Sequence, residues 1–142
     1  ALKTDRIGVL GFSAGGQASL KAATNPVLWT GSPSATAANI RPDFLMLVYP
    51  WGLYDAKTKA LRPDLLISAQ TPPTFLAQAG DDKASLPQGS TLAYLKLIES
   101  GVPAELHIYE TGGHGFGLRS SKSPATTDWT LRAADWFRTR GF

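Results

Sequence analysis

The run Phe44-Leu45-Met46-Leu47-Val48-Tyr49 limits the possible folds of this chain more than any other segment. A strand with one face in water alternates apolar and polar residues, but this run has no polar residue and is typical of a strand covered on both faces. Such strands occur in parallel sheets, which have helices on both sides. The run therefore predicts a buried strand of a parallel α/β sheet.

Apolar and helical segments alternate along the rest of the chain. Strands are predicted at 6–12, 44–49, 74–78 and 104–109, and helices at 17–23, 91–100 and 129–140. The helix 91–100 is expected to bury Leu92, Tyr94, Leu95 and Ile98, and the helix 129–140 to bury Trp129, Ala133, Trp136 and Phe137. Strands that alternate with helices in this way predict an α/β fold with right-handed crossovers.

Two segments lack a clear strand or helix pattern. Residues 25–42 are small and polar and contain several prolines, so they are predicted to form a loop with little regular structure. Residues 50–73 have mixed character, and one short helix is predicted at 64–68. We interpret both segments as connections within one domain.

Composition narrows the class of protein. The 142 residues, of which 43% are hydrophobic and 18% charged, suffice for one compact core and are too few for two domains. The absence of cysteine excludes a disulfide scaffold, a thiolate metal site and a cysteine nucleophile. It does not indicate whether the protein belongs to an oxidising or a reducing compartment, because secreted proteins can also lack cysteine.

The net charge of +3 comes from the end of the chain. Basic residues outnumber acidic ones between Arg119 and Phe142, but they lack the density and the interleaved aromatic residues of a nucleic-acid-binding stripe. We interpret them as the solvated face of the last helix. No apolar run approaches the roughly 18 residues of a membrane span. We therefore expect neither a nucleic-acid partner nor a membrane span.

Gly11-Phe12-Ser13-Ala14-Gly15 follows a predicted strand directly and opens a predicted helix. So sharp a turn puts its serine in a strained conformation and brings the residues two before and two after it together. Only glycine is expected to fit at Gly11 and Gly15, and Gly16 gives the helix room to pack. The spacing is that of a nucleophile elbow, so Ser13 is the candidate nucleophile.

A serine nucleophile needs an imidazole to accept its proton, and a carboxylate to orient that imidazole. His114 lies in a glycine-rich loop just after the strand 104–109, at the edge where open α/β sheets gather their functional loops. His107 lies inside that strand, and we interpret it as a side chain on the polar face beside Glu105. His114 is therefore the candidate base.

The candidate carboxylates follow the strand 74–78. Asp81 and Asp82 are neighbours in a loop and point in different directions, so only one of them can face His114. We prefer Asp82, and interpret Asp81 as a capping or turn residue. The glycine-rich segment 111–117 lacks the spacing and the following helix of a dinucleotide fingerprint, and the chain has no phosphate-loop or metal-binding motif. No cofactor is expected.

Several segments together carry a resemblance to a known family. They are Ile7-Gly8-Val9-Leu10-Gly11-Phe12-Ser13-Ala14-Gly15-Gly16, Tyr49-Pro50, Pro72-Pro73-Thr74-Phe75-Leu76, Asp81-Asp82, Gly101-Val102-Pro103-Ala104-Glu105-Leu106-His107-Ile108-Tyr109 and Gly112-Gly113-His114-Gly115-Phe116. This combination resembles the C-terminal half of an α/β-hydrolase esterase. Within that fold the chain is most similar to bacterial acetyl xylan esterases and feruloyl-esterase-like carbohydrate esterases.

The resemblance implies a catalytic triad of Ser13, Asp82 and His114, in the chain order of α/β-hydrolases. It implies that the four strands are strands five to eight of the family's sheet, with no large cap insertion. It also implies an oxyanion hole that combines the N–H of Ala14 with an N–H from a glycine-rich loop after strand three, which this chain does not contain. Gln78 departs from the pattern, since relatives often carry histidine there. We interpret this departure as affecting substrate preference.

The first residues, Ala1-Leu2-Lys3-Thr4-Asp5, contain neither an initiator methionine nor a signal-peptide pattern. Together with the resemblance, they lead us to expect that residues 1–142 form a single α/β-hydrolase domain truncated at its N-terminus. Localisation stays open. A secreted or periplasmic location would suit a polysaccharide substrate.

The predicted function is hydrolysis of short-chain carboxylic esters through an acyl-enzyme intermediate, with acetyl groups on carbohydrates as favoured substrates. The expected partner is therefore a small-molecule or oligosaccharide ester. Two alternatives stay open, a serine peptidase of the prolyl oligopeptidase type and a noncatalytic binding protein of the same fold. The upstream sequence would separate the peptidase from the esterase, and reaction with a fluorophosphonate would separate either from a noncatalytic protein.

Overall fold

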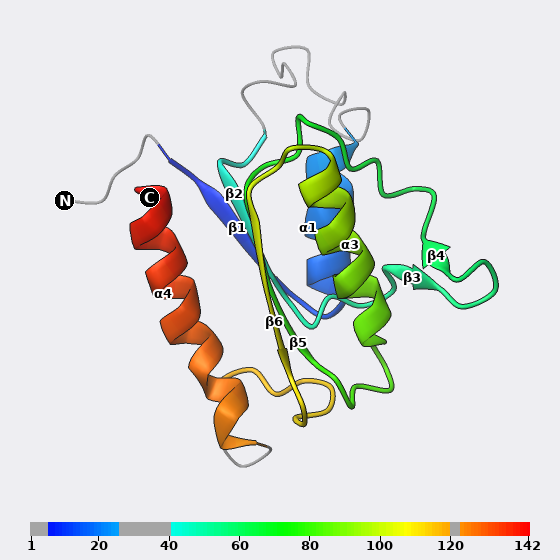
Figure 1. Cartoon of the computed structure of the whole chain (residues 1–142), viewed down its shortest axis with the longest axis vertical. Helices are drawn as coiled ribbons and strands as arrows, with labels where there is room; N and C mark the ends of the chain where they lie inside the picture. Colours follow the sequence, from blue (N-terminus) through cyan, green and yellow to red (C-terminus); the bar gives the residue numbers. More distant parts are fainter. Residues whose placement is uncertain (1–5, 26–40, 120–122) are drawn as a thin grey trace.

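The computed structural model describes residues 6–25, 41–119 and 123–142. Its main sheet has parallel strands in the order β1-β2-β5-β6 (Figure 1). These strands are β1 (Gly8–Phe12), β2 (Phe44–Val48), β5 (Thr74–Ala79) and β6 (Ala104–Tyr109). The predicted strands and the parallel α/β fold are confirmed.

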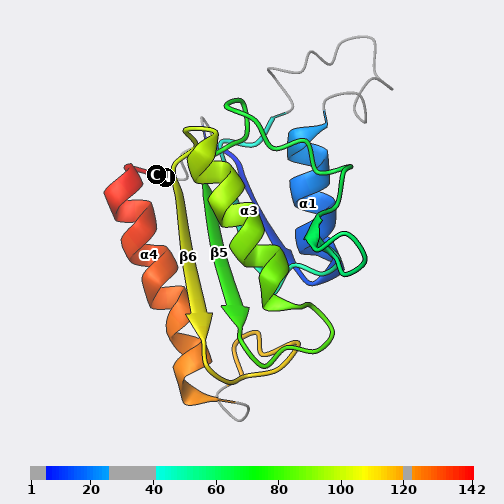
Figure 2. The same cartoon turned by 45° about the vertical axis from the view of Figure 1, so that its right-hand side comes forward.

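Helices cover both faces of the sheet. α1 (Ala14–Thr24) and α3 (Pro87–Glu99) lie on one face, and α4 (Trp129–Arg140) lies on the other (Figure 1, Figure 2). A short 3-10 helix, η2 (Pro124–Asp128), leads into α4. The helices predicted at 17–23, 91–100 and 129–140 are confirmed, although α1 and α3 begin earlier than predicted. The carboxyl ends of the parallel strands consequently meet at one edge of the sheet.

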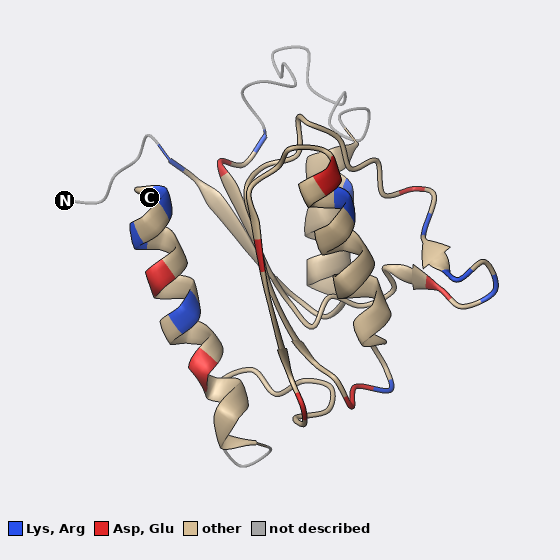
Figure 3. Cartoon of the chain, in the orientation of Figure 1, with Lys and Arg blue, Asp and Glu red and all other residues tan. Residues whose placement is uncertain are grey.

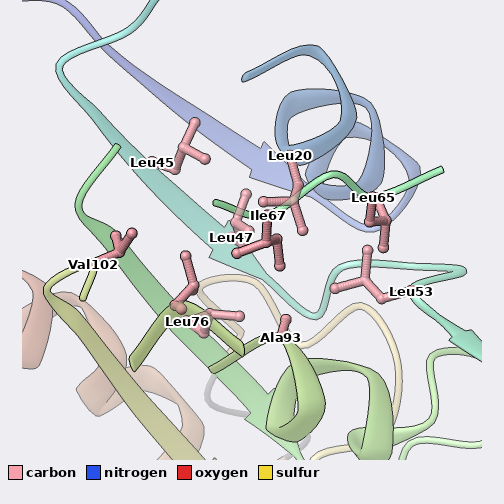
Figure 4. Packing of buried hydrophobic residues seen from close by; sticks show 10 residues of the cluster. Leu20, Leu45, Leu47, Leu53, Leu65, Ile67, Leu76, Ala93 and Val102 are labelled. Atoms are coloured by element: carbon pink, nitrogen blue, oxygen red, sulfur yellow. The ribbon is translucent and has the colours of Figure 1, made fainter. Parts of the chain in front are cut away.

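The core on the side of α1 and α3 is aliphatic. Buried side chains from both helices, from β2 and β5 and from the connector converge there (Figure 4): Leu20, Leu45, Leu47, Leu53, Leu65, Ile67, Leu76, Ala93, Leu97 and Val102. Full burial of one such leucine stabilises a fold by roughly 1.5–3 kcal/mol. This cluster therefore holds α1 and α3 on the sheet.

The core on the side of α4 is largely aromatic. Trp129, Ala133 and Trp136 are at most 4% exposed and pack against the sheet. Phe137 extends this stripe, because its ring lies 4.9 Å from that of Phe44 in β2, and Trp136 lies 6.4 Å from the same ring. The predicted apolar stripe of the last helix is confirmed.

The buried face of α3 differs from the prediction. Leu95 and Ile98 are each 48% exposed, and Leu92 and Tyr94 are only partly buried. The helix instead buries its small residues and one leucine, which are Gly89, Ser90, Ala93 and Leu97. A Cβ added at Gly89 would lie 3.1 Å from the Cβ of Leu53, so the first turn of α3 packs too closely on the connector for a larger residue at that position.

The predicted helix at 64–68 is wrong, because this part of the connector is not helical. Leu65 and Ile67 are buried, with exposures of 8% and 7%, whereas Leu66 between them is 51% exposed. Side chains that alternate between core and solvent are characteristic of extended chain. The extended conformation places two of these three apolar side chains in the core.

The connector between β2 and β5 contains a small antiparallel pair, β3 (Tyr54–Asp55) and β4 (Ala60–Leu61), which the sequence did not predict. It holds no large cap domain, as expected. Most of the loop predicted at 25–42 lies outside the described residues.

Residues of both charge signs lie along α4 (Figure 3). Arg132 forms an ion pair of 2.8 Å with Asp128, one turn earlier, and Arg138 pairs with Asp135, and the side chains of both arginines are exposed. The interpretation as a solvated helix face is confirmed for the basic residues of α4, whereas Arg119 precedes the helix and Lys122 lies outside the described residues. Within the described ranges, no helix is long and apolar enough to cross a membrane.

Candidate active site

Ser13 lies where β1 ends and α1 begins. Its backbone has φ of 52° and ψ of −121°, outside the conformations that residues other than glycine usually adopt, so the predicted strain is present. The N–H groups of Gly16, Gln17 and Trp51 donate to its carbonyl oxygen, at 3.0, 3.3 and 2.8 Å. Its own N–H donates to the Val48 carbonyl at 3.1 Å. These bonds hold the strained serine in place.

Close packing explains two of the three glycines in this turn. A Cβ added at Gly11 would lie 2.6 Å from the carbonyl oxygen of Gly15, and one added at Gly16 would lie 2.8 Å from the Cβ of Pro50. The predicted close approach is confirmed at both positions. At Gly15 no described atom lies within 4 Å of an added Cβ, so the prediction that only glycine fits is wrong there.

The glycine-rich loop after β6 brings His114 to Ser13. The Ser13 Oγ and His114 Nε2 atoms are 2.8 Å apart. Gly113 and Gly115 have φ of 61° and 74°, a left-handed conformation that lets the chain turn sharply on both sides of the histidine. The structure thus places an imidazole nitrogen within hydrogen-bond distance of the candidate nucleophile.

Asp82 lies on the other side of the imidazole. Its Oδ2 atom is 2.8 Å from His114 Nδ1, and the residue is only 1% exposed. The N–H groups of Ala84 and Ser85 donate to its Oδ1 atom at 2.9 and 2.8 Å, as a buried carboxylate requires. A carboxylate at Nδ1 favours the tautomer with its proton there, which leaves Nε2 able to accept the serine proton.

Asp81 binds the backbone of the histidine loop. Its exposed carboxylate accepts a hydrogen bond of 2.7 Å from the Gly113 N–H, and this bond is the main cause of the lowered pKa of Asp81. At the far end of the loop, the Trp129 Nε1–H donates to the Gly117 carbonyl at 2.8 Å. The loop that carries His114 is therefore anchored on both sides of the histidine.

His107 lies inside β6 with its side chain bound to Glu105. Its Nε2 atom is 2.7 Å from the Glu105 Oε1 atom, and its ring lies 5.5 Å from that of Phe75. The interpretation of His107 as a side chain of the sheet face is confirmed.

Tyr49 lies beside the candidate base, a role that the sequence did not assign to it. Its ring packs edge-on against the His114 imidazole with a centroid distance of 5.1 Å. Burial raises the pKa of the Tyr49 phenol, although Arg119 and a hydrogen bond with the Gly117 backbone act in the opposite direction. The phenol therefore stays protonated near neutral pH. The signals in the sequence were its place at the end of the apolar run and the Tyr49-Pro50 segment of the resemblance.

Gln78 lies closer to the site than the sequence suggested. Its side chain is fully buried, and its Nε2 atom donates to Asp82 Oδ2 at 3.2 Å. The resemblance leads to the expectation that this residue affects substrate preference, but its side chain contacts the buried carboxylate. A polar residue in an otherwise apolar strand, four positions before Asp82, was the available signal.

Ala14 is the first residue of α1. The N–H groups in the first turn of a helix have no acceptor inside the helix, and the helix dipole makes this end favourable for negative charge. The Ala14 N–H is thus a donor next to Ser13. In residues 6–25, 41–119 and 123–142, no three or more His, Cys, Asp or Glu side chains gather in a group that could hold a metal ion.

Comparison with known proteins agrees with this architecture. Residues 1–141 match the Dienelactone hydrolase family. No curated protein matches the chain. Among solved structures, an acetyl ester-xyloside bifunctional hydrolase from Caldicellulosiruptor lactoaceticus is 32% identical, with a TM-score of 0.79, and the match covers 99% of this chain and 59% of that protein.

Two more distant structures share the fold. The carboxylesterase Cest-2923 from Lactobacillus plantarum WCFS1 is 21% identical with a TM-score of 0.74, covering 99% of this chain and 60% of that protein. The esterase Est2 from Thermogutta terrifontis is 19% identical with a TM-score of 0.71, covering 95% and 55%. The chain thus spans little more than half the length of each of these proteins. Because the family match extends over nearly all of its residues, the chain belongs to the dienelactone hydrolase family and has the α/β-hydrolase fold.

Proposed function

We propose that this protein is a serine esterase that hydrolyses short-chain carboxylic esters, with acetyl groups on carbohydrates as its favoured substrates. The observation that carries this proposal is the continuous row of Ser13 Oγ, the His114 imidazole and Asp82 Oδ2, with both contacts at 2.8 Å. This arrangement has the order and spacing that a serine needs to become a nucleophile near neutral pH.

In the proposed reaction, Ser13 Oγ attacks the ester carbonyl while His114 Nε2 accepts the hydroxyl proton. Asp82 holds the imidazole in the required tautomer and stabilises its charged form. The Ala14 N–H donates to the oxyanion of the tetrahedral intermediate. His114 then returns the proton to the leaving alcohol. Water, activated by the same imidazole, releases the acid from the acyl-enzyme.

Two observations favour small acyl groups. The 32%-identical relative is described as an acetyl ester-xyloside hydrolase. In addition, the connector between β2 and β5 contains only the short β3–β4 pair, so it offers no inserted domain to bury a long acyl chain. Each further methylene would need new apolar contacts to contribute its roughly 0.8 kcal/mol. The value of kcat/KM should therefore fall as the acyl chain lengthens.

A series of p-nitrophenyl esters tests the proposal in the full-length protein. We expect kcat/KM to fall beyond about four acyl carbons. Acetylated xylo-oligosaccharide, a feruloylated sugar and an aryl acetate, compared side by side, would identify the alcohol. A preference for long acyl chains or for proline-containing peptides would contradict the proposed substrate class. Failure of a fluorophosphonate to label Ser13 would support a noncatalytic role instead.

A further inference from the structure

Gln78 is a polar residue near the carboxyl end of β5, a strand whose six residues are all buried. Its side chain is 0% exposed. A buried primary amide needs partners for its N–H donors and its carbonyl acceptor, because water cannot reach them. The contacts of this amide therefore indicate what the residue does.

The Gln78 amide is fully engaged. The two N–H groups on its Nε2 atom have three acceptor oxygens within reach, those of the Ser85 carbonyl at 3.0 Å, Asp82 Oδ2 at 3.2 Å and the Ala79 carbonyl at 3.3 Å, so one N–H is shared between two acceptors. Its Oε1 atom accepts a hydrogen bond of 3.0 Å from the Ser90 hydroxyl on α3. Carbonyl and carboxylate oxygens cannot donate, so turning the amide over would place Oε1 against acceptors. The contacts thus select one orientation of the amide.

Each oxygen of the Asp82 carboxylate is held by two N–H groups. Oδ1 accepts from the backbone of Ala84 and Ser85, and Oδ2 accepts from Gln78 Nε2 and is paired with His114 Nδ1. Gln78 therefore binds the same oxygen that faces the imidazole. Without this donor, backbone bonds would still hold Oδ1, but His114 alone would hold Oδ2.

We propose that Gln78 is a positioning residue for ester hydrolysis: its amide, oriented by Ser90, keeps Asp82 Oδ2 on the His114 Nδ1 atom. The proposal rests on the function proposed above. Gln78 does not touch the reacting atoms, and it acts through Asp82. Catalysis depends steeply on such geometry, since a displacement of about 1 Å can reduce the rate by about 10²-fold.

The first test is Gln78→Met, which keeps the length of the side chain and removes the donor. In the full-length protein we expect kcat for p-nitrophenyl acetate to fall by about 10- to 100-fold with little change in KM. Thr74→Val is the matched control, because it removes a buried side-chain hydrogen bond, to the Pro72 carbonyl, at the opposite end of β5. An equal loss of kcat in Thr74→Val would assign the effect to weakening of β5 and overturn the proposal.

Gln78→Glu gives a readout that a purely structural role would not produce. The introduced carboxyl can donate to Asp82 Oδ2 only while it is protonated, and burial next to Asp82 raises its pKa. The ratio of its kcat/KM to that of Gln78→Met should therefore fall as pH rises. Asp82 and Tyr49 face His114 in both variants, so Gln78→Met is the reference for any change in their contributions once the amide is absent. Activity of Gln78→Glu that does not exceed that of Gln78→Met at any pH would overturn the proposal.

Two further variants keep the test decisive if Gln78→Met does not fold. Ser90→Ala removes the hydroxyl that orients the amide, and it should lower kcat in the same direction by a smaller factor. Gln78→His supplies a ring N–H donor and should retain part of the wild-type kcat. Unchanged kcat in Ser90→Ala, or no activity in a folded Gln78→His variant, would contradict the proposal.

Nuclear magnetic resonance separates this proposal from the proposed function. The chain contains only two histidines, so the Nδ1 proton of His114 can be followed in histidine-labelled protein without any substrate. We expect a slowly exchanging resonance in the wild type that broadens in Gln78→Met. If the wild type shows this resonance but no esterase activity, the proposed function fails while the positioning contact stands. If Gln78→Met leaves the resonance unchanged, the positioning role fails.

Discussion

β5 and β1 are both apolar in sequence, but they differ in the structure. All six residues of β5 are buried between β2 and β6, whereas β1 lies at the edge of the described sheet. In β1, Leu10 and Phe12 are 49% and 38% exposed. This comparison indicates that an apolar run predicts a strand, whereas the order of strands in the sheet decides how much that strand contributes to the core.

The same contrast holds for the polar residues that follow the two strands. Ser13, after β1, is partly accessible, whereas Asp82, after β5, is 1% exposed and surrounded by donors. A nucleophile has to be accessible to its substrate, whereas a residue that orients a histidine needs no contact with substrate and can be buried. The edge strand thus presents the proposed reacting group, and the central strand supports it. Three experiments address this division, beginning with the largest expected effect, and a fourth addresses how α1 is held to the connector.

Replacement of the nucleophile after β1 should have the largest effect. We expect Ser13→Ala to lower kcat on a p-nitrophenyl ester by roughly 10³- to 10⁶-fold with no loss of folding, because it removes a nucleophile and no part of the core. Steady-state kinetics and thermal unfolding of the full-length protein measure both quantities. Ser19→Ala, farther along α1, is the control and should retain activity, because its partly buried hydroxyl donates to the Gly15 carbonyl and has no predicted catalytic role. Activity retained in Ser13→Ala would remove Ser13 from the mechanism.

The two neighbouring aspartates after β5 should differ strongly. Asp82→Asn is expected to lower kcat by about 10⁴-fold, because an amide at His114 Nδ1 favours the wrong tautomer. Asp81→Asn should cost about tenfold or less, since its side chain binds backbone N–H groups, mainly that of Gly113, and not the His114 ring. Kinetics of both variants at the pH optimum decide the assignment. If Asp81→Asn proves the more harmful, Asp81 is the orienting carboxylate.

Matched leucine truncations test the difference in burial directly. Leu76→Ala in β5 should lower the free energy of unfolding by about 2–5 kcal/mol, since Leu76 is fully buried. Leu10→Ala in β1 should lower it by about 1 kcal/mol, because this side chain is already 49% exposed. Urea unfolding measures both. Equal losses would show that β1 is as well covered in the full-length protein as β5.

The smallest effect concerns the ion pair that links α1 to the connector. Lys21 Nζ lies 2.7 Å from Asp64 Oδ2, and hydrogen bonds from Lys21 and Arg62 lower the pKa of Asp64 from 3.8 to about 2. A carboxyl with a lowered pKa stabilises the fold above pH 3.8, and this contribution disappears as pH falls toward 2.

Both partners of this pair are substantially exposed, so solvent screening limits the contribution to less than about 1 kcal/mol. Asp64→Asn should therefore destabilise the protein slightly at pH 7, and by much less near pH 2, where about half of the Asp64 carboxylate is protonated. Denaturant unfolding at the two pH values checks this prediction. A loss at pH 7 that persists unchanged at low pH would show that the charge of Asp64 is not its cause.

The sequence predicted the elements and the positions of the candidate site residues. The periodicity of apolar residues lies within each segment, so the strands, the helices and the stripe of α4 could be predicted locally. The sharp strand-to-helix turn at Ser13 could be predicted for the same reason, because the glycine spacing is local. His114 was preferred over His107 because one follows a strand and the other lies inside it. The structure places His114 beside Ser13 and Asp82, whereas their catalytic roles stay predictions.

Three features could be seen only in the tertiary structure. They are the buried face of α3, the conformation of the connector and the contacts of Gln78. Each of these depends on surfaces that come from distant parts of the chain. α3 buries small residues because Leu53 leaves little room, and Leu65 and Ile67 extend to fill the same core. The Gln78 amide reaches Asp82 because the loop after β5 folds back over it. The hydrophobicity of a segment does not predict such distances, since they are set only when the elements pack together.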